Sequence, residues 1–282
     1  MQELDEAVRR ATGARPLAYT PRAGGYSTAD RHAVELADGR SVFVKSSATP
    51  NLAGWIRREH EVYGALAGRF MPELLGFDDD GERATLVLED LSGADWEVRW
   101  DAARVDAVRA ALAELSASPP PPDTPQARDA FSEFWDRWGV VESEPAPFLS
   151  LGLRDETWLE RALPALRAAV SDDVGTGDRV CHMDLRSDNL CFRDGRAIFV
   201  DWNWTCLADP RLDLAGWAPS LHCEGGPPPW EMLDDAGALA ALIAGVWAAI
   251  AGLPPLPTAP NVRALQRRQL AVALDWIDRD LL

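Results

Sequence analysis

The chain has 282 residues, of which 47% are hydrophobic, and it carries a formal net charge of −17 at pH 7. This acidity excludes nucleic acid as a partner, because phosphates are repelled where no basic stripe attracts them. Residues 1–5 are rich in acids and lack an apolar stretch, so we expect no secretory signal and a cytoplasmic protein.

The first part of the chain predicts strands joined by tight turns. Gly24 and Gly25 precede an extended stretch that ends at Leu36, and an Asp-Gly turn then leads into an apolar run ending at Lys45. Two adjacent glycines alone are weak evidence, because most such pairs mark ordinary turns.

Lys45 is the only lysine, since the other 27 of the 28 basic residues are arginine. A position that keeps lysine suggests a need for a compact ammonium on a flexible stem, which a planar guanidinium cannot imitate. A lysine that grips nucleotide phosphates is such a case. The alternative is sequence drift at a solvated strand end.

Residues 52–66 predict an amphipathic helix. Its apolar positions, which include Trp55 and Tyr63, recur at helical spacing, and Glu59 is the one charged member of that stripe. A carboxylate on a core-facing stripe needs a cationic partner, because unpaired burial of a polar group costs about 2 kcal/mol or more. Lys45 is the candidate partner for Glu59, and Glu61 is the competing acid.

A hairpin is predicted near residue 195. Residues 189–192 and 197–200 are apolar runs around an Asp-Gly pair, which is a strong signal for a two-residue turn. Counting back from the turn places Asn189 opposite Val200, with Asp201 one step beyond. An amide and a carboxylate at one end of a hairpin are ligands that suit Mg²⁺ beside nucleotide phosphates.

Asp184 precedes Asn189 by five residues, across a short loop. A carboxylate at this place can orient an acceptor hydroxyl and receive its proton when phosphorus is attacked. The three side chains Asp184, Asn189 and Asp201 therefore predict phosphoryl transfer from a metal-bound nucleotide.

The pattern H-x-D-L-x-x-x-N at residues 182–189, followed by Asp-Trp at 201–202, resembles the catalytic loop and metal-binding aspartate of the aminoglycoside phosphotransferase and choline kinase-like family. Residues 208–215 are similar to a motif that follows the metal aspartate in that family. Met183 and Ala208 depart from the family pattern, in which glycine is usual at both places.

The resemblance implies a role for each part of the site. It makes Asp184 the catalytic residue that receives the proton, gives Arg186 a role near the transferred phosphate, and has His182 and Asp213 brace the catalytic loop. Asn189 and Asp201 hold Mg²⁺. The residues that it assigns to ATP are Gly24, Gly25 and Ser27 of a glycine-containing phosphate loop, Lys45 with its partner Glu59, and the backbone of Glu89 and Leu91 at a hinge.

The resemblance also implies an α+β, two-lobed protein-kinase-like fold. Residues 1–91 would form a small lobe with an antiparallel sheet that binds the nucleotide, and residues 92–282 a larger, mostly helical lobe for catalysis and acceptor binding. A run without charges at 236–253 is long enough to raise a membrane span. Its larger apolar residues mark one stripe, which favours a buried helix of the large lobe instead.

We expect an ATP- and Mg²⁺-dependent phosphotransferase that modifies a hydroxyl of a small, cationic acceptor such as an aminoglycoside or an amino sugar, and that acts in antibiotic resistance or metabolism as a monomer or homodimer. The acidic surface suits a cationic acceptor, and some of the 12 tryptophans are candidates for contacts with it. The alternatives are a choline, sugar or amino-acid kinase, a regulatory pseudokinase, and a zinc-dependent hydrolase that uses Cys and His. The cysteine spacings match no common zinc site.

Overall fold

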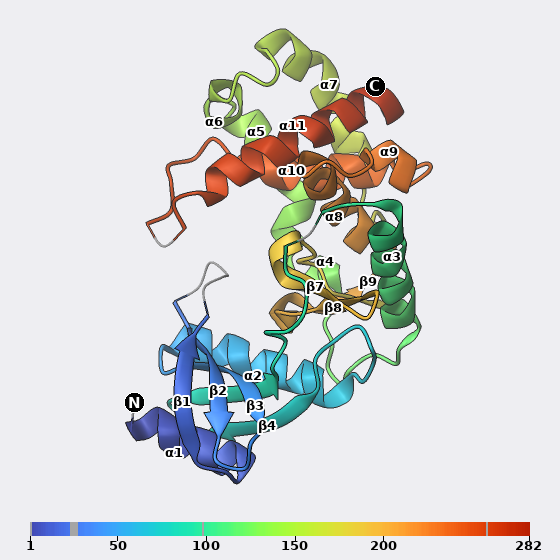
Figure 1. The fold of residues 1–282 in the computed structure, drawn as a ribbon. Helices are drawn as coiled ribbons and strands as arrows, with labels where there is room; N and C mark the ends of the chain where they lie inside the picture. Colours follow the sequence, from blue (N-terminus) through green and yellow to red (C-terminus); the bar gives the residue numbers. More distant parts are fainter. Residues whose placement is uncertain (1, 23–27, 98, 258) are drawn as a thin grey trace. The chain divides into compact units, whose positions relative to one another are not determined.

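The computed structural model describes residues 2–22, 28–97, 99–257 and 259–282 (Figure 1). The chain divides into two compact units, each built from several segments of the sequence. The first unit comprises residues 1–98, 103–123 and 188–205, and the second comprises residues 99–102, 124–187 and 206–282. The predicted hairpin thus groups with the N-terminal region, and the placement of a lobe boundary at residue 91 stays a prediction.

A five-stranded antiparallel sheet forms the body of the first unit, with strand order β1-β2-β3-β5-β4. This sheet and the many helices of the chain confirm the predicted α+β fold class. The strands are β1 (Pro16–Pro21), β2 (Asp30–Leu36), β3 (Ser41–Ser47), β4 (Leu74–Asp79) and β5 (Ala84–Glu89).

The helices α1 (Gln2–Thr12) and α2 (Pro50–Ala65) pack against this sheet. Val42 and Val44 of β3 are fully buried in a cluster with residues of α1. Because successive side chains of a strand point to opposite faces, Lys45 projects away from that cluster. Its ion pair with Glu59 of α2 shows that the opposite face meets α2.

The buried face of α2 differs from the predicted one at Trp55. This residue is 49% exposed, whereas Ala53, Ile56 and Val62 are fully buried. The apolar stripe therefore predicted the helix correctly, but the buried face of the helix is rotated slightly from the predicted one. Glu59 lies on the buried face, as predicted, and Glu61 is exposed.

The predicted hairpin consists of β7 (Leu190–Arg193) and β8 (Arg196–Phe199), and its register is the one expected. Asp194 and Gly195 both have positive φ, at 52° and 75°, which the two-residue turn requires. The Val200 amide donates to the Asn189 carbonyl at 2.9 Å, so this pair closes the open end of the hairpin. The first unit also holds most of α3 (Ala102–Ala117).

The second unit is mostly helical and contains a large hydrophobic core. A short antiparallel pair, β6 (Arg179–Cys181) with β9 (Cys206–Ala208), lies in this unit. Its helices are α4 (Ala127–Ala130), α5 (Arg137–Ser143), α6 (Ala146–Ser150), α7 (Glu156–Ala169), α8 (Arg211–Cys223), α9 (Pro229–Met232), α10 (Gly237–Ile250) and α11 (Val262–Asp280).

The uncharged run of the sequence forms α10, which is buried within the core of the second unit, as predicted. Most of its fully buried positions are alanine or glycine, whereas Ile243 and Ile250 are only partly buried. The stripe of larger residues is therefore not the most buried face, because small side chains permit the closest packing. No helix among the described residues has the length and hydropathy needed to cross a membrane.

Candidate functional site

Lys45, Glu59 and Asp201 form one ionic cluster in the first unit. The Lys45 ammonium donates to a carboxylate oxygen of Glu59 and, at 2.8 Å, to Oδ1 of Asp201. The side chains of Lys45 and Glu59 are 9% and 2% exposed. The structure thus contains the predicted Lys45–Glu59 pair, and it joins β3, α2 and the end of the hairpin at one point.

The cluster has one more negative than positive group. Burial opposes the charged form of Lys45, but the carboxylates of Glu59 and Asp201 outweigh it and raise the Lys45 pKa. Burial raises the pKa of Glu59 to about 7 against the attraction of Lys45, and the charge of Asp201 adds to this rise. Two carboxylates share one ammonium here, an arrangement that an added cation would stabilise.

Asn189 and Asp201 lie at the same end of the hairpin, as the register predicts. Asn189 is 2% exposed, and the Asp201 side chain is 28% exposed. Asp201 has left-handed backbone angles, with φ 70° and ψ 64°, which are uncommon for a residue other than glycine. An amide oxygen and a partly open carboxylate form a donor set that fits Mg²⁺.

The predicted hinge follows β5. The Leu91 carbonyl accepts from the Ala94 amide at 3.0 Å and from the Trp96 indole at 2.9 Å. Within the part of the chain that the structure describes, no hydrogen bond of the Leu91 amide is present. An amide in this position is able to read an adenine ring, whereas the Glu89 side chain turns to Arg193.

The hinge is fixed by side chains of the first strands. Asp90 accepts from Ser41 of β3 at 2.5 Å and from the Ser92 amide at 2.9 Å. Arg22, which follows β1, donates to the Ser92 hydroxyl. The predicted phosphate-loop residues Gly24, Gly25 and Ser27 lie outside the described residues, and their role stays a prediction.

Residues 182–187 of the predicted catalytic loop belong to the second unit, where Asp213 of α8 holds them. The buried Asp213 carboxylate accepts from the His182 amide at 2.8 Å and from the Met183 amide at 2.7 Å. His182 is fully buried, and its Nδ1 accepts from the Asp184 amide at 3.3 Å. Both bracing roles that the resemblance implies therefore have contacts that support them.

Met183 has a left-handed φ of 67°. Glycine adopts this conformation without strain, which gives a physical reason for the glycine that is usual at this place. The Asp213 carboxylate receives the amide of Met183, so the loop keeps this conformation with a larger residue. Ala208, the other departure from the pattern, lies in the regular strand β9.

Arg186 and Asp184 form a salt bridge two residues apart, with side chains that are 20% and 23% exposed. The guanidinium donates to Oδ1 of Asp184. The pair thus places a carboxylate and a guanidinium at one site.

A third feature of the second unit was not found from the sequence. Glu224, which follows α8, accepts from the Trp100 indole at 2.8 Å and from the Ser187 hydroxyl of the catalytic loop. The Trp100 ring packs edge-on against Trp217, with 5.2 Å between the ring centroids. Trp100 and Glu224 are 124 positions apart in the sequence, so no local pattern predicts their contact.

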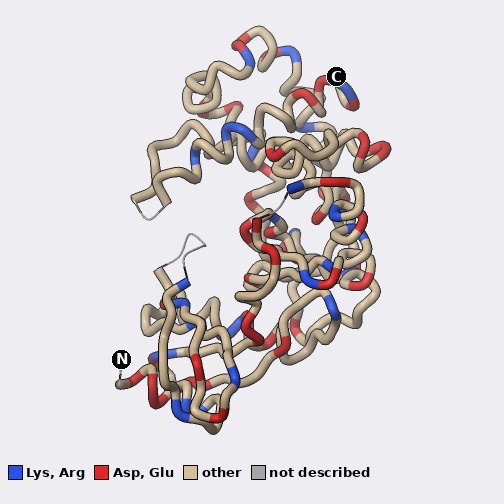
Figure 2. The backbone as a smooth tube through the Cα atoms, viewed as in Figure 1, with Lys and Arg blue, Asp and Glu red and all other residues tan. Residues whose placement is uncertain are grey.

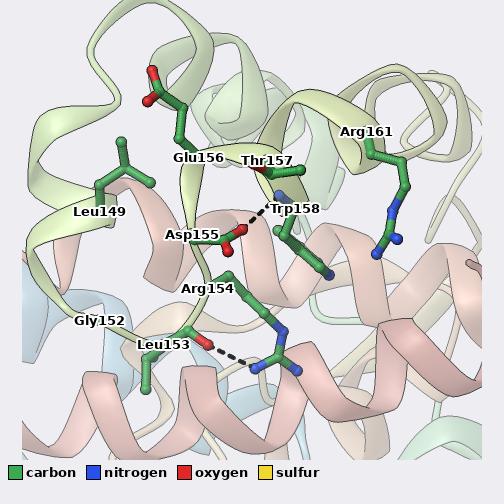
Figure 3. Close-up of a pocket in the computed structure, with 9 residues that line it drawn as sticks. All are labelled: Leu149, Gly152, Leu153, Arg154, Asp155, Glu156, Thr157, Trp158 and Arg161. Carbon is green, nitrogen blue, oxygen red and sulfur yellow. Dashed lines mark hydrogen bonds between the residues drawn. The ribbon is translucent and has the colours of Figure 1, made fainter.

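A cavity of about 740 Å³ in the second unit is lined by the end of α6, the α6–α7 loop and the start of α7 (Figure 3). Arg154 at its wall donates to Asp275 and Asp278 of α11, and the Trp158 indole also donates to Asp278. None of the predicted site residues lines it. These contacts fasten α7 to α11, and we assign this region a structural role.

Cysteine and histidine form no zinc site in the described residues, where no group of three or more His, Cys, Asp or Glu is arranged to hold a metal. All four cysteines are free, and Cys181, Cys191 and Cys206 are buried. Burial raises the pKa of the Cys191 thiol to about 12. Buried thiols of this kind behave as small apolar side chains.

Comparison with known families now decides the class of this chain. The family model described as "Phosphotransferase enzyme family" matches residues 18–253. The chain belongs to the phosphotransferase enzyme family. This membership confirms the resemblance noted from the catalytic-loop pattern and supports a small-molecule kinase over a zinc-dependent hydrolase.

Solved structures with a similar fold span nearly the whole chain. An amicoumacin kinase, hAmiN, in complex with AMP-PNP, Ca²⁺ and Ami is 15% identical with a TM-score of 0.58, over 97% of this chain and 93% of that one. A macrolide 2′-phosphotransferase, MphH, from Brachybacterium faecium is 15% identical with a TM-score of 0.56, over 97% of both chains. At these identities the similarity establishes the kinase-like fold of the phosphotransferase.

Sequence similarity to a curated protein is confined to a short segment. Protein LicA of Haemophilus influenzae is 39% identical over 44 residues, which span 16% of this chain and 16% of that protein. The chain therefore matches about one sixth of the length of this curated relative.

Proposed function

We propose that this phosphotransferase moves the γ-phosphate of ATP to a hydroxyl of a small cationic molecule, with Mg²⁺ as cofactor. The cluster of Lys45, Glu59 and Asp201 carries the proposal. A buried ammonium held by two carboxylates, at the end of the hairpin that also bears Asn189, is the arrangement that a metal-bound triphosphate needs.

Each residue of the first unit has a defined task in this proposal. Lys45, positioned by Glu59, contacts the α- and β-phosphates, and the Leu91 amide and Glu89 carbonyl bind adenine. Asn189 and Asp201 would hold Mg²⁺, which neutralises the charge that develops on the phosphates. hAmiN was solved with the ATP analogue AMP-PNP, which supports ATP as the donor.

The residues of the second unit act on the acceptor. Asp184 orients the acceptor hydroxyl and takes its proton as oxygen attacks phosphorus. Arg186, which pairs with Asp184, stabilises the negative charge of the transferred phosphoryl group. Asp213 and His182 hold the loop so that the Asp184 carboxylate keeps one orientation.

Glu224 and Trp100 support a cationic acceptor. They place a carboxylate and an indole beside Ser187, three residues after Asp184. A carboxylate next to an aromatic ring attracts an ammonium through charge and cation–π interactions. The acceptor is therefore expected to carry a cationic nitrogen, as aminoglycosides, amino sugars and choline do.

The test is ADP release from ATP and Mg²⁺ with a panel of aminoglycosides, amino sugars, choline and neutral sugars. Asp184→Ala removes the proton acceptor, and Asp178→Asn is the matched control because its side chain is 88% exposed. We expect Asp184→Ala alone to abolish turnover. Unchanged activity of Asp184→Ala contradicts the mechanism, and tight ATP binding without turnover of any acceptor favours the pseudokinase.

A second pair of variants tests the charge of the acceptor. Glu224→Gln is expected to raise KM for the amine-bearing acceptor while KM for ATP stays unchanged, and exposed Glu231→Gln serves as the control. If neutral sugars prove to be the better acceptors, or if Glu224→Gln leaves KM unchanged, the cationic acceptor is wrong. The panel also separates a resistance role from a choline- or sugar-type kinase; the cytoplasmic location and the monomeric or homodimeric state stay predictions.

A further inference from the structure

A second cavity, of about 590 Å³, lies wholly within the first unit. It opens between the end of α2, the loop that leads into β4, the end of β5 and the tip of the β7–β8 hairpin. We refer to it as the α2–hairpin cavity. Its wall includes Tyr63, Leu66, Ala67, Arg69, Met71, Glu73, Glu89, Arg193, Asp194, Arg196 and Ile198.

Some charged side chains at the rim of this cavity have no salt-bridge partner among the described residues. Arg193 forms a salt bridge with Glu89. Arg69 and Arg196 form no salt bridge with any residue that the structure describes, and Glu73 forms none either. Asp194 adds a further carboxylate at the hairpin turn. Two unpaired guanidinium groups and separate carboxylates thus face the same space.

The floor of the cavity is apolar. Leu66, Met71 and Ile198 line it and are 4%, 7% and 3% exposed. A ligand that matches floor and rim has a short hydrocarbon body, an anionic group for the two arginines and a cationic group for the carboxylates. Guanidinium groups bind both carboxylate and phosphate oxygens through paired hydrogen bonds. Two arginines without a salt bridge match the charge of a phosphate monoester, about −2, better than the single charge of a carboxylate.

Backbone hydrogen bonds link the elements that surround the cavity. The Phe199 amide of β8 donates to the Phe70 carbonyl at 2.7 Å, and the Glu89 amide donates to the Glu73 carbonyl at 2.9 Å. Tyr63 lines the cavity one helical turn after Glu59. Burial, together with the charges of Glu59 and Asp201, raises its pKa well above the ordinary value.

We propose that the α2–hairpin cavity is a second ligand site, which binds a small zwitterionic phosphomonoester, a phosphate ester that also carries an amine. The product of the proposed reaction belongs to this class, and that one identification rests on the proposed function.

Isothermal titration of the full chain with phosphocholine tests the site without any turnover. Arg69→Ala/Arg196→Ala removes the unpaired cations, and Ala67→Phe fills the cavity from an exposed position without changing charge. Arg9→Ala/Arg15→Ala removes two exposed arginines elsewhere in the first unit and is the matched control. We expect the affinity to fall about tenfold or more, 1.4 kcal/mol, in the first two variants and to stay unchanged in the third.

Several results overturn the proposal. Equal affinity of the wild type and Arg69→Ala/Arg196→Ala places the ligand elsewhere, and absence of binding to folded wild type removes the site. Inorganic phosphate that binds as tightly as phosphocholine shows a simple anion site and contradicts the zwitterion. ADP release is measured in parallel: phosphocholine binding without kinase activity defeats the proposed function and leaves the cavity site standing.

Discussion

Replacing Asp213 with Asn tests how the catalytic loop is held. The substitution keeps the shape of the side chain but leaves one oxygen to accept from two amides, those of His182 and Met183. One buried N–H then lacks an acceptor, which costs about 1–3 kcal/mol. The freed amide lies directly beside Asp184, so we expect the loop to lose its fixed geometry and kcat to fall up to about a hundredfold.

At neutral pH the substitution should lower the free energy of unfolding by less than the cost of the unpaired N–H alone. The reason is that burial of the native Asp213 carboxylate also costs free energy. Burial raises the pKa of Asp213 from the ordinary 3.8 to about 6, although the two amides favour its charged form. The folded protein therefore keeps a proton that the unfolded chain has lost between about pH 4 and 6. The free energy of unfolding falls as pH rises through this window, by about 3 kcal/mol at most.

Two measurements separate these effects. Urea unfolding between pH 4 and 7 should show that Asp213→Asn removes the part of the pH dependence between 4 and 6, and that the variant is close to the wild type in stability at pH 7. The wild-type kcat should decline as pH falls below about 6, where Asp213 gains its proton, and the variant should lack that decline. A folded Asp213→Asn with wild-type kcat at neutral pH refutes the bracing role.

The remaining predictions concern the ionic cluster and the core. Glu59→Gln leaves Lys45 with one carboxylate and should raise KM for ATP about tenfold. Exposed Glu61→Gln should leave KM for ATP unchanged. If steady-state kinetics show the same change in KM for both variants, the assignment of Glu59 is contradicted. Lys45→Arg puts a larger, planar cation into a 9% exposed position and should lower kcat/KM for ATP about a hundredfold; a wild-type value would show that a generic cation suffices. Gly245→Ala puts a Cβ 2.9 Å from Nε1 of Trp138 and should cost about 1–3 kcal/mol in thermal unfolding; an unchanged Tm would mean that the indole moves freely.

The end of the hairpin that carries Asn189 and Asp201 was predictable because its determinants are local. An Asp-Gly turn fixes the register of the hairpin. The register alone places Asn189 opposite Val200, and Asp201 is the next residue after Val200. The Lys45–Glu59 pair was predictable for a different reason. A charged residue on a buried helical face demands a partner, and one lysine was available.

The inner face of α2 was less predictable, because a helix has no sharp boundary between its faces. Trp55 has a large apolar side chain, as many core residues do, but it is 49% exposed, whereas Ala53 is fully buried. Hydrophobicity alone ranks these two in the opposite order. The close approach of α2 to the sheet selects the smaller side chain, and only the packed structure contains that information.

Glu224 and Trp100 show the larger limit of sequence reasoning. Neither belongs to a motif, and their contact depends on the path of the chain across the second unit. Acidic residues are spread along both units with basic residues among them (Figure 2), so the net charge of −17 does not single out any acid. What distinguishes Glu224 is its pair of donors, one of which is Ser187 in the catalytic loop.

The acidity of the chain has opposite consequences for the two proposed substrates. It attracts a cationic acceptor at long range and repels ATP. The first unit counters this repulsion weakly, because Lys45 is already shared by Glu59 and Asp201. A triphosphate that arrives with Mg²⁺ supplies the missing positive charge and satisfies Asp201 at the same time. Under the proposed function, metal dependence therefore follows from the charge balance of the ionic cluster as well as from the demands of phosphoryl transfer.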